Sequence, residues 1–400
     1  MKTAYIIDAV RTPIGKYGGS LSSVRSDDLA ALAIKSLLER NPKLPNDKIE
    51  DVILGCTNQA GEDSRNVARM ALLLAGLPVD TGGVTINRLC ASGMQAVIDA
   101  SRAVKLDEGD IFIAGGTESM SRAPWVVRKS ETPFGRNAQI FDSTIGWRFT
   151  NPKLAEMYYP HSMGETAENV AEKWNISRQE QDEFALSSQK KYKTAFEHGK
   201  FKEEIIPVEI PQRKKESLIV SVDEHPRPDV SIEQLAKLKP AFREGGTVTA
   251  GSSSGINDGA SALIVASEDI VNRYDLKPKV KILSSAVAGV DPALMGTGPI
   301  PATRKALKRA GLTIEDLDLI ELNEAFAAQS IACIRDLNIN PDIVNVNGGA
   351  IALGHPLGCS GARIITTLYH EMCKRDNVKY GLATLCIGVG QGASMIFEKV

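Results

Sequence analysis

The sequence lacks a strong net charge and any long apolar run. With 47 Lys and Arg against 49 Asp and Glu, the formal net charge is −2, so no basic surface for nucleic acid is expected. No segment approaches the roughly 18 consecutive apolar residues of a membrane span. The apolar run at the N-terminus is interrupted by Asp8 and is too short for a signal peptide, so we interpret it as an opening strand.

The sequence also lacks closely spaced cysteines, since none of the six forms a CxxC pair. In a chain of 400 residues with no sign of secretion, this favours free thiols over a disulfide framework or a structural zinc site. We therefore expect a reducing compartment, by default the cytoplasm. The composition, 43% hydrophobic and 24% charged, is that of an ordinary globular chain that can form two or three core-bearing layers.

Two halves of the chain repeat the same order of patterns at an offset close to 270 residues. In each half an amphipathic helical pattern precedes an apolar strand pattern. A turn of small residues with a cysteine, at Cys90 and again at Cys359, then opens a second helical pattern and a further strand. The first matching segments are residues 28–38 with 301–310, and residues 51–55 with 318–322.

The alternation of helices and strands predicts an α/β fold with two layers of largely parallel strands, packed through buried central helices. Sites in such folds lie beyond strand ends and at helix starts. The segment between the halves contains all three tryptophans and a helical stretch over residues 166–197, which predicts a loop domain that holds a bulky substrate. The expected boundaries are 1–120 and 246–275 for the first core half, 121–245 for the loop domain and 276–400 for the second core half.

Four residues in turns or at strand ends could together carry out chemistry on a carbonyl compound. Cys90 comes just before a helical pattern, where unpaired amides favour a thiolate. Cys386 ends a strand pattern, His355 stands between Gly354 and a proline, and Asn323 follows another strand. A lone cysteine in such a turn is commonly a small buried apolar residue. A nucleophilic thiol, a base and a second proton-transfer group nevertheless form a complete catalytic set.

Glycines accompany these residues. Gly388, Gly390 and Gly392 follow Cys386 and would allow backbone amides to approach an oxygen closely, as an oxyanion hole requires. The polar loop at residues 251–255 could bind an amide or phosphate of a carrier molecule, although by itself it is typical of a flexible surface loop.

At these residues the sequence resembles the thiolase family over nearly its whole length. The motifs are Asn-Glu-Ala-Phe at 323–326, Asn-Gly-Gly-Ala-Ile-Ala-Leu-Gly-His-Pro at 347–356, Gly-Val-Asp-Pro at 289–292 and Gly-Thr-Gly-Pro-Ile-Pro at 296–301. The condensing enzymes of fatty acid synthesis share the duplicated fold but have histidine where thiolases have the second cysteine, so Cys386 favours a thiolase. The resemblance implies a duplicated thiolase fold, layered α-β-α-β-α with an inserted loop domain.

The resemblance also implies roles for individual residues. Cys90 would be the acylated nucleophile, His355 its base, and Cys386 the group that moves a proton at the α-carbon. Asn323 would hold a water that faces the thioester oxygen together with His355, and the amides of Cys90 and Gly388 would face the oxygen of the acyl-enzyme. Coenzyme A would be a substrate rather than a permanently bound cofactor, and no metal is implied. Its predicted contacts are Met163, Arg227, Ser254, Ala325 and Phe326.

Departures from the family pattern bear on the substrate. Biosynthetic acetoacetyl-CoA thiolases usually have His-Met-Gly where this chain has Ser162-Met-Gly, with its histidine displaced to His161. The segment 145–152 and Cys359 look more like degradative thiolases, including those that act on 3-oxoadipyl-CoA. We therefore predict cleavage of a 3-oxoacyl-CoA to acetyl-CoA and a shortened acyl-CoA, as in β-oxidation, with condensation of two acetyl-CoA as the alternative.

Two interpretations from other classes stay open at this point. The chain could be a CoA-binding redox protein in which Cys90 and Cys386 form a reversible disulfide, although His355 and Asn323 would then have no task. It could also be a partner subunit without activity, although such subunits normally lose catalytic residues. The expected partners are acyl-CoA and CoA, with no nucleic acid and no membrane span, and the family implies a homodimer or homotetramer.

Overall fold

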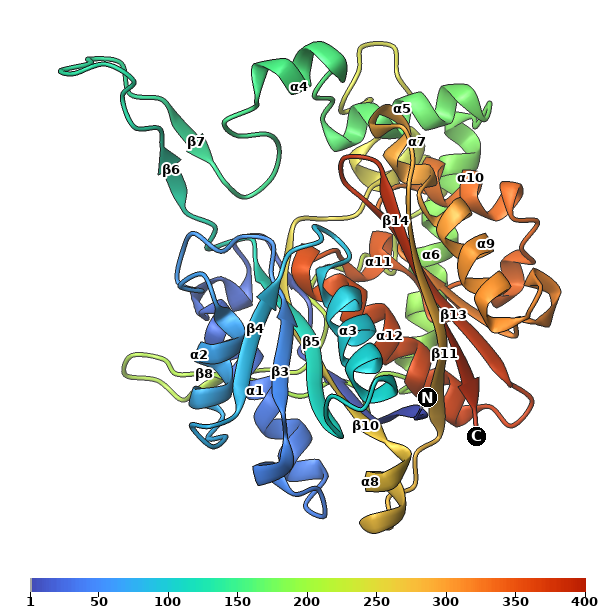
Figure 1. Ribbon diagram of the computed structural model, residues 1–400. Coiled ribbons are helices and arrows are strands. Elements are labelled where there is room, and N and C mark those ends of the chain that lie inside the picture. The colour runs from blue at the N-terminus through green and yellow to red at the C-terminus, as the bar shows by residue number, and fades with distance from the viewer. Residues whose placement is uncertain (1) are drawn as a thin grey trace.

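In this computed structural model, which describes residues 2–400, helices and strands alternate along both halves of the chain (Figure 1). The first half contains β1 (Ala4–Arg11), β2 (Gly15–Lys16), α1 (Ser26–Arg40), β3 (Asp51–Gly55), α2 (Val67–Leu74), β4 (Gly82–Ile86), α3 (Ser92–Lys105) and β5 (Ile111–Ser119), and, after a long insertion, β10 (Asn257–Ser267) and α8 (Glu268–Arg273). The second half contains β11 (Val280–Gly289), α9 (Pro299–Ala310), β12 (Leu319–Leu322), α10 (Ala327–Asp336), α11 (Ala350–Leu353), α12 (Leu357–Lys374), β13 (Tyr380–Ile387) and β14 (Gln391–Lys399).

The helices and strands form five layers, with three apolar clusters packed between them. The largest apolar cluster joins α3 and α12 to the inner faces of both sets of strands. A second cluster packs α1 and α2 on the outer face of the first set, and a third packs α9 and α10 on the outer face of the second. Because strands such as β5 and β10 are covered on both sides, every one of their residues is buried. The predicted α-β-α-β-α layering of two α/β halves is confirmed (Figure 1).

The strand order shows the duplication directly. The first half runs β1-β10-β5-β3-β4 and the second half runs β11-β14-β13-β12, and a short pairing of β1 with β11 joins them into one sheet. The expectation of largely parallel strands is wrong. Parallel pairs are β3 with β4, β3 with β5 and β12 with β13, whereas all pairs made by β10, β11 and β14 are antiparallel. β14 follows β13 after only three residues, a connection too short for a parallel crossover, so that pair has to be antiparallel.

The two central helices touch backbone to backbone where each begins. A Cβ on Gly93 of α3 would lie 2.8 Å from the backbone nitrogen of Ala362 and from the carbonyl oxygen of Gly358 in α12. A Cβ on Gly361 of α12 would lie 2.3 Å from the backbone nitrogen of Met94 in α3. Glycine is therefore required at both positions. This close approach places the turn before α3 beside the turn before α12.

The insertion between β5 and β10 lies mostly outside the layered core. It contains β6 (Trp125–Val127), β7 (Ile140–Asp142), α4 (Pro152–Met157), α5 (Met163–Lys173), α6 (Arg178–Glu197), β8 (Val208–Ile210), β9 (Leu218–Val220) and α7 (Ile232–Ala236). The single helical stretch predicted over residues 166–197 is two helices, because Asn175 has a φ of 51° and Ser177 caps a new helix. In Figure 1, β6, β7 and α4 stand above the ends of β3, β4 and β5.

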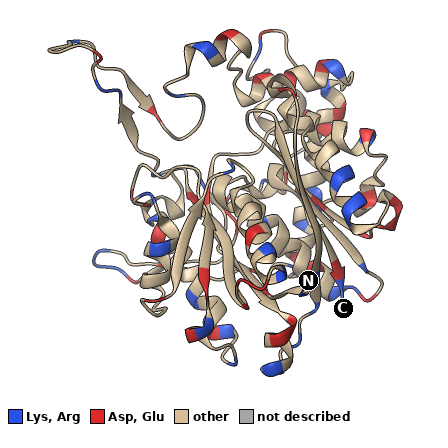
Figure 2. Ribbon diagram, in the orientation of Figure 1, with Lys and Arg blue, Asp and Glu red and all other residues tan. Residues whose placement is uncertain are grey.

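Charged residues of both signs are dispersed along the visible helices and loops of the ribbon, and neither sign is gathered in one region of this view (Figure 2). Within residues 2–400, no helix combines the length and the apolar character needed to cross a membrane.

Candidate active site

Cys90 lies in a tight turn between β4 and α3. Leu89 has a φ of 46°, a left-handed conformation that is unusual for a bulky residue. Its backbone N–H donates to Oδ1 of Asn87 at 2.9 Å, and its carbonyl accepts from Oγ of Ser92 at 2.6 Å. The Asn87 amide also donates to the carbonyl of Thr57, which follows β3 by two residues, at 3.0 Å. These contacts hold the strained turn that presents the Cys90 thiol.

Cys90 is half-buried, and its thiol faces two backbone amides. The backbone N–H groups of Gly388 and of Cys90 itself donate toward the sulfur, which favours the thiolate. Burial has the larger effect and raises the pKa of Cys90 to about 11. The backbone amides thus favour the thiolate, as expected for a helix start, but burial outweighs them and the net effect is a raised pKa of Cys90.

His355 lies in the turn between α11 and α12. Gly354, at φ 104°, allows the chain to turn, and the His355 backbone N–H donates to Oδ1 of Asn257 on β10 at 2.9 Å. Burial lowers the pKa of His355 to about 3, with a smaller effect from Arg363. The imidazole is therefore neutral at pH 7.

The hydrogen bonds of His355 define which ring nitrogen is the base. Nδ1 lies 2.6 Å from Oγ of Ser360, and that hydroxyl donates its proton to the carbonyl of Pro356 at 2.8 Å. The hydroxyl can then only accept from Nδ1, so Nδ1 carries the ring proton. Nε2 is buried and has no partner among the described residues. Its free lone pair fits it to take a proton from a thiol or hydroxyl placed beside it.

Asn323 begins the turn after β12, where its backbone N–H donates to the carbonyl of Thr384 on β13 at 3.0 Å. Its side-chain nitrogen lies 3.4 Å from Nδ1 of His355. Its side-chain oxygen is buried and unpartnered among residues 2–400, like Nε2 of His355. Two such atoms from neighbouring side chains indicate a place for a water or a substrate oxygen, because buried polar atoms are otherwise paired.

Cys386 lies at the end of β13, close enough to Cys90 for the two thiols to influence each other's ionisation. Its side chain packs in an apolar cluster with Met163, Ala325 and Phe326. Burial raises the pKa of Cys386 well above its ordinary value, and the neighbouring Cys90 raises it further. A protonated thiol therefore stands beside the nucleophile.

The glycines after Cys386 have two different roles. Only the amide of Gly388 points at Cys90. A Cβ on Gly390 would lie 2.3 Å from the carbonyl oxygen of Val290, and one on Gly392 would lie 2.0 Å from the backbone of Gly298. The expectation that all three glycines form an oxyanion hole is therefore wrong for Gly390 and Gly392, which allow the β13–β14 turn and β14 to pack directly on the backbone before α9.

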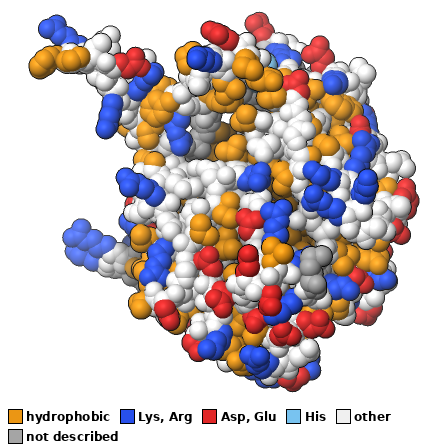
Figure 3. Space-filling view, in the orientation of Figure 1, with side chains coloured by type: hydrophobic (Ala, Val, Ile, Leu, Met, Phe, Trp, Pro, Cys, Tyr) orange, Lys and Arg blue, Asp and Glu red, His pale blue; other side chains and the backbone are white. Residues whose placement is uncertain are grey.

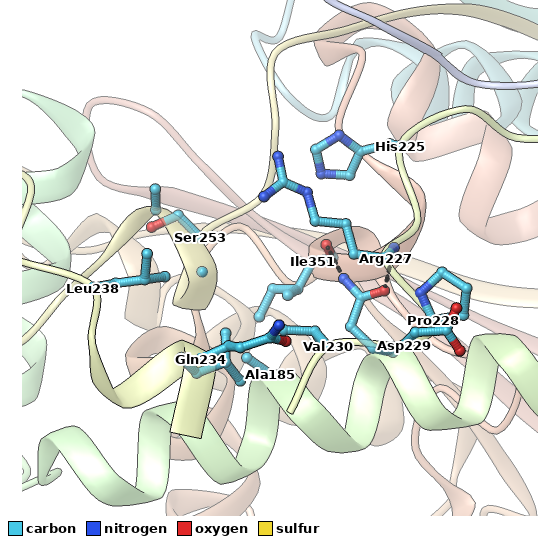
Figure 4. Close-up of a pocket in the computed structure, with 14 residues that line it drawn as sticks. Ala185, His225, Arg227, Pro228, Asp229, Val230, Gln234, Leu238, Ser253 and Ile351 are labelled. Carbon is cyan, nitrogen blue, oxygen red and sulfur yellow. Dashed lines mark hydrogen bonds between the residues drawn. The ribbon is translucent and has the colours of Figure 1, made fainter. Parts of the chain in front are cut away.

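The predicted CoA contacts fall into two connected groups. Arg227 lines a cavity of about 540 Å³ beside α6 and α7 (Figure 4). Its backbone N–H donates to Gln189 at 2.8 Å, and Ser253 lines the cavity opposite. Met163, Ala325 and Phe326 instead pack around Cys386. Ser254 joins the groups, since its N–H donates to the carbonyl of Ala325 at 3.0 Å.

Glu118, Ser360 and Asn257 contribute to the site although no sequence motif indicates them. The Glu118 carboxylate, at the end of β5, accepts from the backbone N–H of Gly358 in the first turn of α12 at 2.8 Å. It also accepts from the N–H groups of Thr57 at 2.9 Å and Asn58 at 3.1 Å. One buried side chain thus joins the His355 turn to the segment that supports the Cys90 turn. The one sequence feature that could have indicated Glu118 is that it is a charged residue in an otherwise apolar strand pattern.

No group of three or more His, Cys, Asp or Glu side chains in the described part of the chain is arranged to bind a metal ion. All six cysteines are free thiols in the structure.

Comparison with known proteins identifies the family. Residues 4–269 match the thiolase N-terminal domain and residues 276–399 the thiolase C-terminal domain. The chain is 56% identical to the 3-oxoadipyl-CoA/3-oxo-5,6-dehydrosuberyl-CoA thiolase of Escherichia coli K12, over the full length of both. Its structure matches the acetyl-CoA acetyltransferase of Bacillus anthracis with a TM-score of 0.94 at 41% identity, covering 100% of this chain and 99% of the other. Human mitochondrial 3-ketoacyl-CoA thiolase in complex with CoA gives 0.92 at 42% identity, with coverage of 100% and 98%. The chain therefore belongs to the thiolase family of acyltransferases, as its sequence motifs predict.

Proposed function

We propose that this thiolase cleaves a 3-oxoacyl-CoA with free CoA, giving acetyl-CoA and a shortened acyl-CoA through an acyl group on Cys90. The observation that carries the proposal is the convergence of a neutral thiol, two amides and a second protonated thiol in one place. A neutral imidazole with a free Nε2 stands in the adjacent turn before α12. A non-catalytic redox role for Cys90 and Cys386 would leave the unpartnered atoms of His355 and Asn323 without a purpose.

In the first step the Cys90 sulfur attacks the ketone carbon while Nε2 of His355 takes the thiol proton. The amides of Cys90 and Gly388 donate to the oxygen that becomes negative. The bond between the α- and β-carbons then breaks, and the acetyl-CoA enolate takes a proton from Cys386. This leaves an acyl group on Cys90, a Cys386 thiolate and acetyl-CoA.

In the second step free CoA attacks the acyl-Cys90, and its thiol proton restores Cys386. The shortened acyl-CoA leaves, and the proton on His355 returns to Cys90. During the first step, the newly protonated Nε2 becomes a donor to the thioester oxygen of the enolate. A water on the free side-chain oxygen of Asn323 donates to the same oxygen. Both roles are supported by the two unpartnered atoms that the structure places in neighbouring side chains.

Coenzyme A is assigned to the cavity beside α6, with Arg227 and Ser254 on the carrier and Met163, Ala325 and Phe326 toward the thioester. The contact between Ser254 and Ala325 supports a continuous path from this cavity to Cys386. Arg227 adds a positive charge suited to a phosphate-bearing carrier.

For the acyl chain, we assign a chain that ends in a carboxylate, of the kind in 3-oxoadipyl-CoA. Several relatives at 54–56% identity over the whole chain are named 3-oxoadipyl-CoA or beta-ketoadipyl-CoA thiolases. Ser162, in place of the histidine usual in biosynthetic acetoacetyl-CoA thiolases, argues in the same direction. The degradative reaction is thus preferred to the condensation of two acetyl-CoA.

The test combines a substrate panel with a trapped intermediate. We expect kcat/KM for thiolysis of 3-oxoadipyl-CoA to exceed that for acetoacetyl-CoA. Mass spectrometry after substrate treatment without CoA should find the acyl group on the peptide that contains Cys90. A modification on Cys56, Cys333 or Cys373 would contradict the assignment of the nucleophile.

We also propose that the chain forms a homo-oligomer. The projecting β6–β7 segment exposes large apolar side chains, and Figure 3 shows hydrophobic side chains on this projection. Trp125 is 76% exposed and Phe134 is 100% exposed. Apolar surface of this kind is normally covered by a partner. Light scattering should give at least a dimer for the intact chain, and the double substitution Trp125→Ser with Phe134→Ser should weaken the association.

A further inference from the structure

One arginine in the segment between β7 and α4 has no acidic partner. Arg148 is half-buried, and its only side-chain hydrogen bond within residues 2–400 is from Nη1 to the carbonyl of Ser143 at 3.3 Å. It forms no ion pair with any described residue. Four other arginines of the insertion form ion pairs, Arg122 with Glu62, Arg128 with Glu131, Arg178 with Asp182 and Arg243 with Glu172, whereas Arg136, Arg213 and Arg227 form none with the described residues. A guanidinium has five donors, so most of the donors of Arg148 are free for a ligand.

The first anchor of this segment leads to the Cys90 turn. Ser143 is buried, and its Oγ accepts from the side-chain amide of Asn58 at 2.8 Å. The residue before Asn58, Thr57, accepts from the side chain of Asn87 at 3.0 Å. Asn87 in turn holds the backbone of Leu89, next to Cys90. Ser143, whose carbonyl accepts from Arg148, is therefore linked through Asn58, Thr57 and Asn87 to the turn that holds Cys90.

The second anchor leads to the other wall of the site. The indole N–H of Trp147 donates to the carbonyl of His161 at 3.0 Å. His161 precedes Met163 by two residues, and the Met163 sulfur lies 3.6 Å from the position of a Cβ on Gly388. The segment that contains Arg148 is thus anchored on one side to Asn58 and on the other to His161, two residues before Met163.

The backbone around Arg148 is held in one conformation. Phe149 has a φ of 52°, and its ring packs edge-on against Phe141 of β7 with centroids 5.0 Å apart. A bulky residue in this conformation is strained, and strain of this kind is concentrated at functional sites. The ring contact therefore supports the backbone next to Arg148, and the guanidinium itself is held by the Ser143 carbonyl.

We propose that Arg148 binds the carboxylate at the far end of the acyl chain and so determines selectivity for 3-oxoacyl-CoA substrates with an acidic terminus. The proposal rests on the proposed thiolase function and names a residue for its substrate class. A guanidinium matches a carboxylate with two parallel hydrogen bonds, and partial burial strengthens the pair. A neutral acyl chain would leave the half-buried cation without a counter-ion, which is unfavourable.

The test measures kcat/KM for thiolysis of 3-oxoadipyl-CoA and of 3-oxohexanoyl-CoA, which has the same number of acyl carbons without the charge. Arg148→Gln should lower the value for 3-oxoadipyl-CoA by about 10- to 100-fold, as expected for the loss of a charge-assisted hydrogen bond. The value for 3-oxohexanoyl-CoA should stay within about twofold. Arg148→Lys should recover part of the loss, because lysine keeps the positive charge but lacks the planar guanidinium that donates two parallel hydrogen bonds.

The experiment includes a matched control variant, and several outcomes would contradict the proposal. Arg213→Gln removes an exposed arginine of the β8–β9 loop and should change neither substrate. Equal losses on both substrates for Arg148→Gln, or an unchanged value for 3-oxoadipyl-CoA, would overturn the proposal. If the unaltered protein cleaves 3-oxohexanoyl-CoA and rejects 3-oxoadipyl-CoA, the acidic substrate and the role of Arg148 both fail, while the thiolase function stands. Absence of cleavage and of acyl-Cys90 with every substrate would instead refute the thiolase function.

Discussion

The same connection in the two halves differs greatly in length. In the second half, β13 returns to β14 through three residues, 388–390, and in the first half β5 returns to β10 through residues 120–256. Both strand pairs are antiparallel and occupy the same place in their half of the sheet. The short turn brings the Gly388 amide to Cys90, and the long connection provides Met163, Arg148 and Arg227. In the proposed function, the short turn contributes to the chemistry and the long connection contributes to substrate binding.

The turns before the two central helices, α3 and α12, also differ in the residue that each presents. Cys90 precedes α3 in a strained turn and is half-buried, whereas its counterpart Cys359 is fully buried within the first turn of α12. The turn before α12 presents His355 instead. Because the two helix starts touch, a thiol from one repeat and an imidazole from the other can act on one substrate. In the proposed function, the duplicated fold places the two turns together and the residues that differ between them carry out the reaction.

The largest expected effect compares Cys90 with Cys359. Cys90→Ser should abolish acyl-enzyme formation, because a hydroxyl is far less readily ionised than a thiol beside the same base. Cys359→Ser removes the equivalent cysteine of the other repeat and should still accept an acetyl group from acetyl-CoA on Cys90. Mass spectrometry of the labelled peptides measures both. If both variants lose labelling while their melting temperatures stay unchanged, Cys90 and Cys359 do not differ in role as described.

The second test separates the two thiols of the site. Cys386→Ser should still accept an acetyl group on Cys90, because this transfer moves no proton at carbon. Thiolysis should fall by about 10²- to 10⁴-fold, the usual contribution of general acid–base catalysis. Exchange of the acetyl-CoA methyl protons with deuterated water should fall in parallel. If acylation is lost as completely as in Cys90→Ser, then Cys386 belongs to the activation of the nucleophile.

The third test breaks the link between the repeats. Glu118→Gln replaces a carboxylate oxygen with an amide donor, which cannot satisfy all the N–H groups of Thr57, Asn58 and Gly358. We expect kcat to fall by about 10- to 100-fold, from the loss of charge-assisted hydrogen bonds that hold both turns. CoA affinity, measured by calorimetry, should change little. Glu62→Gln is the matched control, because Glu62 pairs with Arg122 and contacts neither turn.

The smallest effect is the pH dependence of thiol reactivity. Burial raises the pKa of Cys90 to about 11, so below that pH the thiolate fraction should rise about tenfold per pH unit. Alkylation of Cys90 by iodoacetamide between pH 6 and pH 9, quantified on its peptide, should follow this slope without a plateau. A plateau near neutral pH would show that Cys90 and His355 rest as a thiolate and an imidazolium, and not as the neutral pair described above.

The sequence alone determined the duplication, the buried central helices and the family, because these depend on local periodicity and on motifs contained in short segments. It also indicated Cys90, Cys386, His355, Asn323 and Gly388, since each lies in a turn whose neighbours are distinctive. Strand direction, the packing role of Gly390 and Gly392, and the contacts of Glu118, Ser360 and Arg148 were decided by the tertiary structure. They depend on residues far apart in the chain that meet only after folding. The resting charge of Cys90 was decided there too, because burial is a property of the assembled core and outweighs the amides that the local sequence provides.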